Sequence, residues 1–273
     1  MIIDGRAIAA DLKEKIASAI RARGVTPALG IVIVGEDPVI ESFVRIKKKV
    51  GESLGVAIHE FRFPATITGE ELVHEVATIG SRDDLDGLIV QLPLPAHVDV
   101  DQVLSAVPTA KDIDMLAHSS VVQFARGEAV ILPPVAGAVQ EILEREHISV
   151  EGKEVLVLGY GRLVGKPVTI LLQHNHAHVT VVDKPIADLA THVRESDIVI
   201  TGVGSPNLIT PDMLGAHTVL IDAGTSEAGG RIVGDADPRC ADVAALFTPV
   251  PGGVGPIAVA ILFKNLVILS RQT

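Results

Sequence analysis

A lysine interrupts the apolar face of a predicted helix. In the segment 38–54, apolar side chains at positions 40, 43, 50 and 54 follow a spacing of three and four residues, and Lys47 occupies the missing place in that series. Burial lowers the pKa of a lysine toward neutrality, which suits an amine to general acid–base catalysis near pH 7. Alternatively, the stem covers apolar surface while the amine reaches water. The spacing leaves both interpretations open.

Polar side chains that could act with such a lysine come later in the chain. Residues 85–95 form an apolar run interrupted by Gln91, which lies toward the carboxyl end of a predicted strand. Open α/β sheets bind their ligands at that end of their strands. Asp112 and Asp114 follow in a short acidic segment, where they could bind a ligand, form a turn or cap a helix. Capping is the commoner role of such acids.

A glycine-rich turn is a second candidate site. The pattern consists of an apolar strand at 155–158, the glycines Gly159, Gly161 and Gly165, a helix over 164–174, a strand at 179–182 and a final acid, Asp183. Glycine permits positive φ and close backbone approach to a pyrophosphate, and the helix N-terminus presents amide groups to phosphates. The complete strand–turn–helix–strand order predicts dinucleotide binding; the alternative is a structural turn that binds nothing.

Composition limits the class of protein. The chain has 273 residues, 48% of them hydrophobic, and a formal net charge of −11. This length suits two domains, and the negative charge argues against a nucleic-acid or anionic-membrane partner. Cys240 is the only cysteine, and we find neither a signal peptide nor a membrane span, so we expect a cytoplasmic protein. We predict no metal site, because the alternating histidines at 174–178 have no nearby carboxylate or cysteine.

Helix and strand patterns alternate along the chain, which predicts an α/β fold. The predicted helices are 6–23, 38–54, one after the capping box at 68–71, 100–107, 134–146, 164–174, one from 188 and a final apolar helix that starts near Pro256. The predicted strands are 28–35, 56–63, 85–95, 155–158, 179–182, 197–201, 219–223 and 244–250. We also expect a hairpin over 121–132. The final helix should pack back across the chain.

Several motifs resemble the bifunctional methylenetetrahydrofolate dehydrogenase/cyclohydrolase family of one-carbon metabolism. In chain order they are IDGRAIA, VGEDPVIESFVRIKKK, VQLPLP, KDID, LVGKP and TPVPGGVGP. The resemblance covers nearly the whole chain. It implies a folate-binding catalytic domain at 1–134, completed by 254–273, and a Rossmann NAD(P)-binding domain at 135–253. It also implies tetrahydrofolate substrates and a homodimer.

The resemblance assigns roles to the polar residues singled out above. Lys47 falls on the family's catalytic lysine, Gln91 on the glutamine hydrogen-bonded to it, and Asp114 on the aspartate that holds the pteridine ring. The implied reactions are oxidation of 5,10-methylenetetrahydrofolate to the methenyl form with NAD(P), and a weaker hydrolysis of that form to 10-formyltetrahydrofolate.

The chain departs from the family at several substrate positions. Phe43 replaces a tyrosine, so it keeps a ring that can stack on the substrate but lacks the hydroxyl, and Met115 replaces a glycine. The glycine loop beside the folate is retained as Gly252, Gly253 and Gly255, and Pro256, which follows it, is a further expected substrate contact. These departures leave an alternative open, namely a divergent paralogue of the family that is either non-catalytic or a dehydrogenase only. An NAD(P) enzyme acting on another small acid is a further alternative, which VQLPLP and PGGVGP oppose.

The choice of coenzyme is the least determined feature. The expected contacts are Gly159, Gly161, Arg162, Gly165, Asp183 and Lys184. A carboxylate such as Asp183 accepts hydrogen bonds from ribose hydroxyls and repels a 2′-phosphate, which favours NAD. Tyr160 replaces an arginine that binds phosphate in NADP-using members, yet Arg162 or Lys184 could bridge to a phosphate. Alternatively, Asp183 caps the turn that follows it.

Overall fold

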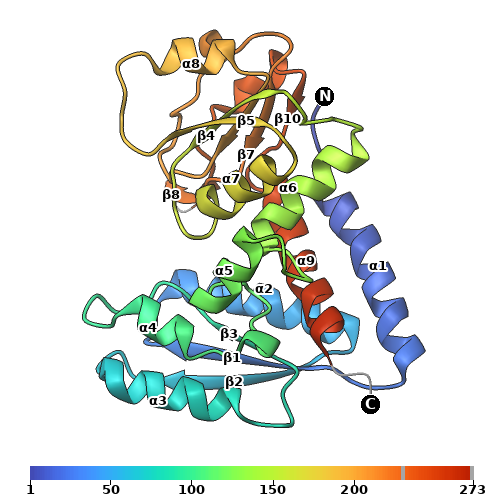
Figure 1. Cartoon of the computed structure of the whole chain (residues 1–273), viewed down its shortest axis with the longest axis vertical. Coiled ribbons are helices and arrows are strands. Elements are labelled where there is room, and N and C mark those ends of the chain that lie inside the picture. Colours follow the sequence, from blue (N-terminus) through green and yellow to red (C-terminus); the bar gives the residue numbers. More distant parts are fainter. Residues whose placement is uncertain (229–230, 271–273) are drawn as a thin grey trace. The chain divides into compact units, whose positions relative to one another are not determined.

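The computed structural model describes residues 1–228 and 231–270, which form two compact units (Figure 1). Unit 1 comprises residues 1–10 and 134–258, and unit 2 comprises residues 11–133 and 259–273. Helices α1 (Gly5–Arg23) and α9 (Val254–Leu269) have residues in both units. Within the described residues, no helix is long and apolar enough to cross a membrane.

Unit 2 is built on a parallel sheet of three strands in the order β2-β1-β3 (Figure 1). The strands are β1 (Ala28–Val34), β2 (Ala57–Phe63) and β3 (Gly87–Val90); the other helices of the unit are α2 (Pro38–Leu54), α3 (Gly69–Gly80), α4 (Val100–Ser105) and α5 (His118–Ala125). Because α2 and α3 connect successive strands, each strand returns in the same direction, as parallel pairing requires.

Helices cover both faces of this sheet. Successive side chains of a strand point to opposite faces, so alternate residues of β1 pack against different helices. On one face, Val32 and Val34 of β1 pack in a cluster with α3 and α4. On the other face, Ile31 and Ile33 pack with α1, α2 and α9. All seven residues of β1 are therefore buried, as expected for the central strand of a parallel sheet.

Local capping fixes the ends of α2 and α3. The Asp37 side chain accepts hydrogen bonds from two amides of the first turn of α2, and Gly55 ends that helix in the left-handed conformation, with φ 79°. Thr68 and Glu71 form the predicted capping box of α3. These predictions of helix ends are confirmed.

Unit 1 contains a parallel sheet of five strands in the order β10-β7-β6-β4-β5. Its strands are β4 (Glu154–Leu158), β5 (His178–Val182), β6 (Ile198–Thr201), β7 (Val219–Asp222) and β10 (Leu246–Phe247); its other helices are α6 (Pro134–Arg145), α7 (Gly165–His174) and α8 (Leu189–Glu195). Taken in chain order this is the doubly wound 2-1-3-4-5 sheet, whose direction of winding reverses between β4 and β6. Ligands of such sheets bind at that reversal, outside the carboxyl ends of the strands.

Three sequence predictions are wrong in detail. The segment 121–132 is not a hairpin, because α5 occupies its first part and buries Ser120 and Phe124 one turn apart. The predicted strand 85–95 is limited to β3, and 244–250 to β10, where prolines without an amide hydrogen follow each strand. The segment between β7 and β10, for which we predicted no helix or strand, also contains two short antiparallel strands, β8 (Ser226–Ala228) and β9 (Arg231–Val233).

Candidate active site

Lys47 and Gln91 meet within unit 2. The Lys47 Nζ atom donates a hydrogen bond of 2.6 Å to Gln91 Oε1. Gln91 follows β3 directly and is only 7% exposed. Its Nε2 donates to the Leu92 carbonyl at 2.8 Å, and its backbone amide donates to the Val32 carbonyl at 2.9 Å. These two bonds leave the amide oxygen directed at the lysine, so the amine of Lys47 does not simply snorkel to water.

Electrostatics tie Lys47 to Asp114. Burial lowers the pKa of the Lys47 amine, and the negative charge of Asp114 partly opposes that change. Burial raises the pKa of the Asp114 carboxyl to about 6; Lys47 lowers it, whereas Asp112 raises it further. Both pKa values are therefore shifted toward neutral pH from the ordinary values of lysine and aspartate. This is the range in which general acid–base groups work best.

The buried face of α2 is displaced from the one we predicted. Ile40, Val44 and Leu54 are buried, whereas Phe43 and Lys47 are half-buried at the edge of that face. The prediction that Phe43 belongs to the central apolar stripe is therefore wrong. Phe43 lies one helical turn before Lys47 on the same side of the helix, so its ring and the amine are available to one ligand.

The turn at 112–117 separates the roles of its two acids. Asp112 is buried, and its carboxylate accepts hydrogen bonds from the amides of Leu116 (3.3 Å) and Ala117 (2.8 Å). It therefore caps the turn, as the commoner interpretation of an acid predicts. Asp114 acts instead on Lys47. Met115 follows Asp114 in this turn, before α5 begins. Its backbone is left-handed, with φ 59°, a conformation that favours glycine.

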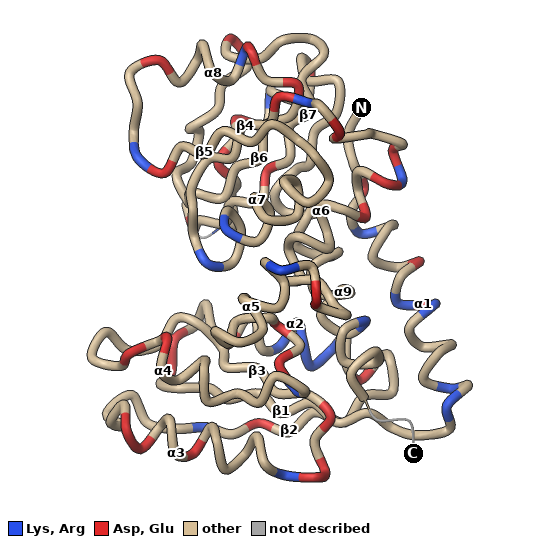
Figure 2. Tube along the Cα trace, in the orientation of Figure 1, with Lys and Arg blue, Asp and Glu red and all other residues tan. Residues whose placement is uncertain are grey.

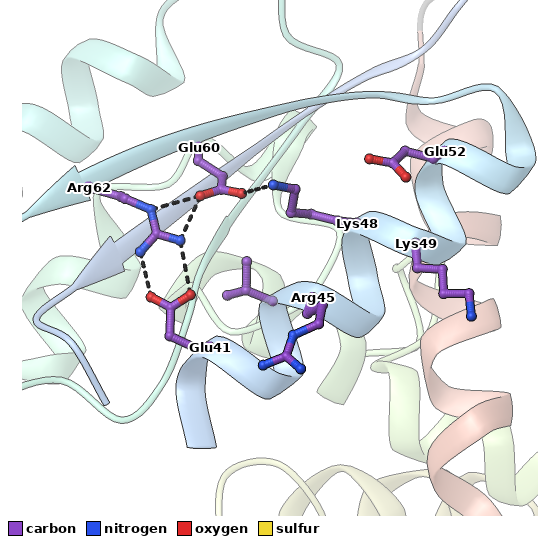
Figure 3. Close-up of a pocket in the computed structure, with 8 residues that line it drawn as sticks. Glu41, Arg45, Lys48, Lys49, Glu52, Glu60 and Arg62 are labelled. Atoms are coloured by element: carbon purple, nitrogen blue, oxygen red, sulfur yellow. Dashed lines mark hydrogen bonds and ion pairs between the residues drawn. The ribbon is translucent and has the colours of Figure 1, made fainter. Parts of the chain in front are cut away.

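The cations that neighbour Lys47 on α2 form a basic stretch (Figure 2), but their environment is different. These cations line a surface cavity of about 350 Å³ between α2 and β2. Figure 3 shows that Lys48 pairs there with Glu60, and that Arg62 pairs with Glu41 and Glu60. Such exposed pairs contribute little stability. Of the lysines in this stretch, Lys47 is the one bonded to a buried amide.

The glycine-rich turn of unit 1 requires glycine at positions 159 and 165. Gly159 has φ 84°, and a Cβ atom on Gly165 would lie 2.0 Å from the Gly159 carbonyl oxygen. A Cβ atom on Gly202, just beyond β6, would lie 2.4 Å from the Val164 side chain. The turn after β4 and the loop after β6 are thus in close contact at the reversal of the sheet. Gly161 has open space around its Cβ position, so it is not needed for packing.

Asp183 contacts the glycine-rich turn. It is exposed at the end of β5, and its Oδ1 atom accepts a hydrogen bond of 2.8 Å from the Tyr160 amide. The bond joins Asp183 to the preceding turn, not to the turn that follows it. The Tyr160 ring also lies 5.8 Å from the Lys166 Nζ atom, a cation–π distance. Lys184 is exposed beside Asp183, and Arg162 is half-buried within the turn.

Two buried acids that we did not predict hold the loops beside this turn. Asp235 accepts hydrogen bonds of 2.7 Å from the Thr201 hydroxyl and from the amides of Val203 and Ser205. Asp222 accepts bonds from three backbone amides, at residues 224, 235 and 236. Burial raises the pKa of Asp222 to about 6. One feature of the sequence could have indicated Asp222 and Asp235: both acids lie where an apolar segment meets a glycine.

The loop containing Gly252 and Gly253 lies against the start of α1. Gly252 has φ 115°, and the Gly253 amide donates to the Pro249 carbonyl at 2.7 Å. A Cβ atom on Gly5 would lie 1.8 Å from the Gly253 carbonyl oxygen, so Gly5 must also be glycine. Pro256 is in the first turn of α9, where its missing amide hydrogen leaves no helical bond unmade.

Comparison with protein families identifies both units. The model for the catalytic domain of tetrahydrofolate dehydrogenase/cyclohydrolase matches residues 3–114, and the model for its NAD(P)-binding domain matches residues 133–273. The chain belongs to this family. The predicted resemblance, the two-domain α/β fold and an NAD(P)-dependent dehydrogenase/cyclohydrolase as the class of enzyme are thereby confirmed.

Similar proteins extend over the full length of the family fold. The bifunctional protein FolD of Nautilia profundicola is 37% identical over 278 residues, which cover 99% of this chain and 97% of the relative. The FolD structure from Campylobacter jejuni has a TM-score of 0.94 at 31% identity, with 98% of each chain covered. The Trypanosoma brucei FolD structure, determined with NADP and an inhibitor, has a TM-score of 0.90 at 36% identity and covers 98% of this chain and 96% of that one.

Across residues 1–228 and 231–270, no three His, Cys, Asp or Glu side chains are placed to hold a metal ion. Of the alternating histidines, His178 instead lies with its Nδ1 atom 2.9 Å from Glu154 Oε1.

Proposed function

We propose that Lys47, Gln91 and Asp114 carry the folate chemistry of this protein. In this proposal the enzyme oxidises 5,10-methylenetetrahydrofolate to the 5,10-methenyl form with NAD(P), and hydrolyses that form to 10-formyltetrahydrofolate. The supporting observation is the 2.6 Å bond from Lys47 to the buried amide of Gln91, in the unit that matches the family's catalytic domain. A lysine that only covered apolar surface would direct its amine to water and not to a buried amide.

The glycine-rich turn fits a dinucleotide. Its backbone comes close to α7 because Gly159 and Gly165 lack side chains, and α7 begins at Gly165 with amides that can bind phosphate oxygens. When bound, NAD(P) supplies the acceptor for the hydride that leaves the methylene carbon of the substrate. Gly161, Arg162 and Lys184 are our proposed contacts around the phosphates and the ribose.

The dehydrogenase step needs positioning more than acid–base catalysis. The lone pair of the neighbouring folate nitrogen stabilises the methenyl cation that forms, so no strong base is required. In this proposal Asp114 holds the pteridine ring and the Phe43 ring stacks on the substrate. By the family resemblance, Gly252, Gly253 and Pro256 are further substrate-binding residues. These contacts lower the barrier by fixing the reacting carbon in place.

The cyclohydrolase step does require proton transfer. The oxygen of a water molecule forms a bond to the methenyl carbon and loses one proton. The bond from that carbon to one folate nitrogen then breaks as the oxygen loses its second proton and becomes the formyl carbonyl. One of the two protons is released to solvent, and the departing nitrogen takes up the other. The Lys47 amine is suited to move this proton, because burial lowers its pKa. Gln91 keeps the amine oriented through the bond to its Oε1 atom. The absence of a hydroxyl at Phe43 makes hydrolysis the weaker reaction.

We favour NAD over NADP, although the family commonly uses NADP. Asp183 ends β5 as an exposed carboxylate, where it can accept hydrogen bonds from the adenosine ribose and repel a 2′-phosphate. One of its oxygens is bonded to the Tyr160 amide. The other oxygen has no partner among the described residues and is suited to a ribose hydroxyl.

We further propose a cytoplasmic homodimer. The family resemblance supports the dimer, and the single cysteine, Cys240, supports a reducing compartment because it cannot form an intrachain disulfide. Light scattering after size exclusion tests the dimer: a mass of one 28.6 kDa chain would contradict it.

One assay tests the proposed function. The purified protein is mixed with 5,10-methylenetetrahydrofolate and either NAD or NADP, and the methenyl absorbance is followed as it rises and then decays by hydrolysis. We expect the absorbance to rise with at least one coenzyme, and to decay faster than in buffer. A rise without enzymatic decay would favour the dehydrogenase-only paralogue, which the changes at Phe43 and Met115 support. No rise with either coenzyme would overturn the proposal.

A further inference from the structure

A polar side chain is buried in the most apolar helix of the protein. Helix α9 reads VGPIAVAILFKNLVIL, and Asn265 within it is only 2% exposed. Burying an amide in such surroundings is unfavourable unless it is hydrogen-bonded. Asn265 meets this condition with its Nδ2 atom, which donates to the carbonyls of Ile113 (2.9 Å) and Leu132 (2.8 Å). Both hydrogens of the amide are therefore used.

The first of these bonds acts on the residue before Asp114. The Ile113 carbonyl and the Asp114 amide belong to the same planar peptide group, so a bond that fixes the carbonyl also fixes the backbone from which the Asp114 side chain projects. Ile113 is fully buried and belongs to the cluster that contains α2 and α9. The peptide group cannot rotate without losing both the bond and this packing.

Two further contacts hold the rest of the turn. Asp112 accepts bonds from the amides of Leu116 and Ala117, and the backbone of Asp112 forms a bridge with Leu88 of β3. The turn at 112–117 is therefore fixed on one side by its own acid and by β3, the strand that leads to Gln91. On the other side it is fixed by Asn265 of α9.

We propose that Asn265 is a positioning residue, which directs the Asp114 carboxylate toward the folate through the Ile113 carbonyl. The second bond, to Leu132, anchors the amide so that its orientation does not depend on the substrate. This inference rests on the proposed role of Asp114 in binding the pteridine. The hydrogen bonds of Asn265 go to the backbone carbonyls of Ile113 and Leu132, so it is proposed to act through Asp114.

The test compares Asn265→Leu with Asn175→Leu. Leucine has nearly the shape of asparagine and removes both hydrogen bonds of Asn265. Asn175 is the control: it is an exposed asparagine at the end of α7 in unit 1, and its Nδ2 atom also donates to a backbone carbonyl, that of Leu171 at 2.8 Å. We expect Asn265→Leu to raise the KM for methylenetetrahydrofolate about tenfold, with the KM for the coenzyme unchanged within twofold. The control should alter neither KM.

A purely structural role gives a different result. If Asn265 only stabilised the fold, its loss would lower the thermal midpoint and the yield of active enzyme, and would leave the folate KM unchanged. That outcome overturns the proposal. Should Asn265→Leu fail to fold, Asn265→Ser keeps a hydroxyl donor and fills less volume; it should raise the folate KM by a smaller factor, and an unchanged KM would again overturn the proposal.

A double substitution separates this inference from the proposed function. In the Asp114→Asn background, Asn265→Leu should have no further effect on the folate KM, because the group that Asn265 directs has been changed. If Asp114→Asn raises the folate KM but the Asn265 variants do not, only the role of Asn265 fails. If Asp114→Asn leaves the folate KM unchanged, the role of Asp114 and the inference that depends on it both fail.

Discussion

Replacing Asp114 by asparagine should make the protein more stable and less active. Burial raises the pKa of this carboxyl from its ordinary value of 3.8 to about 6. The folded protein therefore holds a proton on Asp114 between these pH values, whereas the unfolded chain has already lost it. As pH rises through this window the folded state loses stability relative to the unfolded state. Asparagine, which does not ionise, avoids that loss.

The magnitude follows from the two pKa values. One pKa unit corresponds to about 1.4 kcal/mol, so above pH 6 the ionised carboxyl reduces the free energy of unfolding by about 3 kcal/mol. We therefore expect Asp114→Asn to gain about 3 kcal/mol at pH 7.5, and less than about 1 kcal/mol at pH 4. Folate binding and hydrolysis should fall, because the variant loses the proposed pteridine contact and the charge that acts on Lys47.

Urea unfolding at the two pH values measures this difference. The chain has no tryptophan, so far-UV circular dichroism is the suitable signal. Asp83→Asn is the control, since Asp83 is an exposed aspartate of the same unit, and we expect little change at either pH. A gain of equal size at pH 4 and pH 7.5, or no gain at pH 7.5, would refute the view that an ionised, desolvated Asp114 destabilises the fold.

Four further predictions concern single residues. Lys47→Met should fold normally and lose about 10² to 10⁴ in the rate of methenyltetrahydrofolate hydrolysis while dehydrogenase activity survives; undiminished hydrolysis would remove Lys47 from the mechanism. Phe43→Tyr should raise the cyclohydrolase rate more than the dehydrogenase rate, and equal changes in both rates would count against its place beside the proton path. Asp183→Ser should weaken a native preference for NAD, measured as kcat/KM for both coenzymes; a strong native preference for NADP that the substitution leaves unchanged would show that the carboxylate does not contact the ribose. Met115→Gly should be about 1 kcal/mol more stable to urea than Met115→Ala, because both lose the same buried side chain but only glycine tolerates a φ of 59° without strain; equal stabilities would argue against strain at this position.

The features best predicted from the sequence are those fixed by neighbouring residues, such as the ends of helices. Helix α2 begins and ends where we expected, because Asp37 and Gly55 cap it with their own side chain and backbone conformation. The segment 121–132, which we predicted to be a hairpin, contains one glycine, Gly127. That glycine does have positive φ, 72°, but it follows the end of α5 and does not join two strands. A glycine turn by itself cannot distinguish a hairpin from a helix end.

The contacts that position the candidate site could not be predicted from local pattern. Lys47 was found because it breaks a helical period, and Gln91 because it follows an apolar strand. Their hydrogen bond depends on α2 and β3 packing together in the fold. Asn265 lies 152 residues from Ile113 in the chain, and asparagine near the end of a helix carries no signal of a distant partner. The bonds of Asp235 to residues 201, 203 and 205 likewise depend on the fold, so their partners could not be predicted from local pattern.

The bonds of Asp235 bear on how the coenzyme site forms. Because its carboxylate accepts bonds from Thr201, Val203 and Ser205, the loop after β6 is held in one conformation by the protein alone. A loop that became ordered only on binding would lose about 1–2 kcal/mol of backbone entropy per residue at that moment. Here that entropy is lost during folding, so the free energy of coenzyme binding is not reduced by it. The amides of Val203 and Ser205 should accordingly exchange slowly with deuterium before any coenzyme is added.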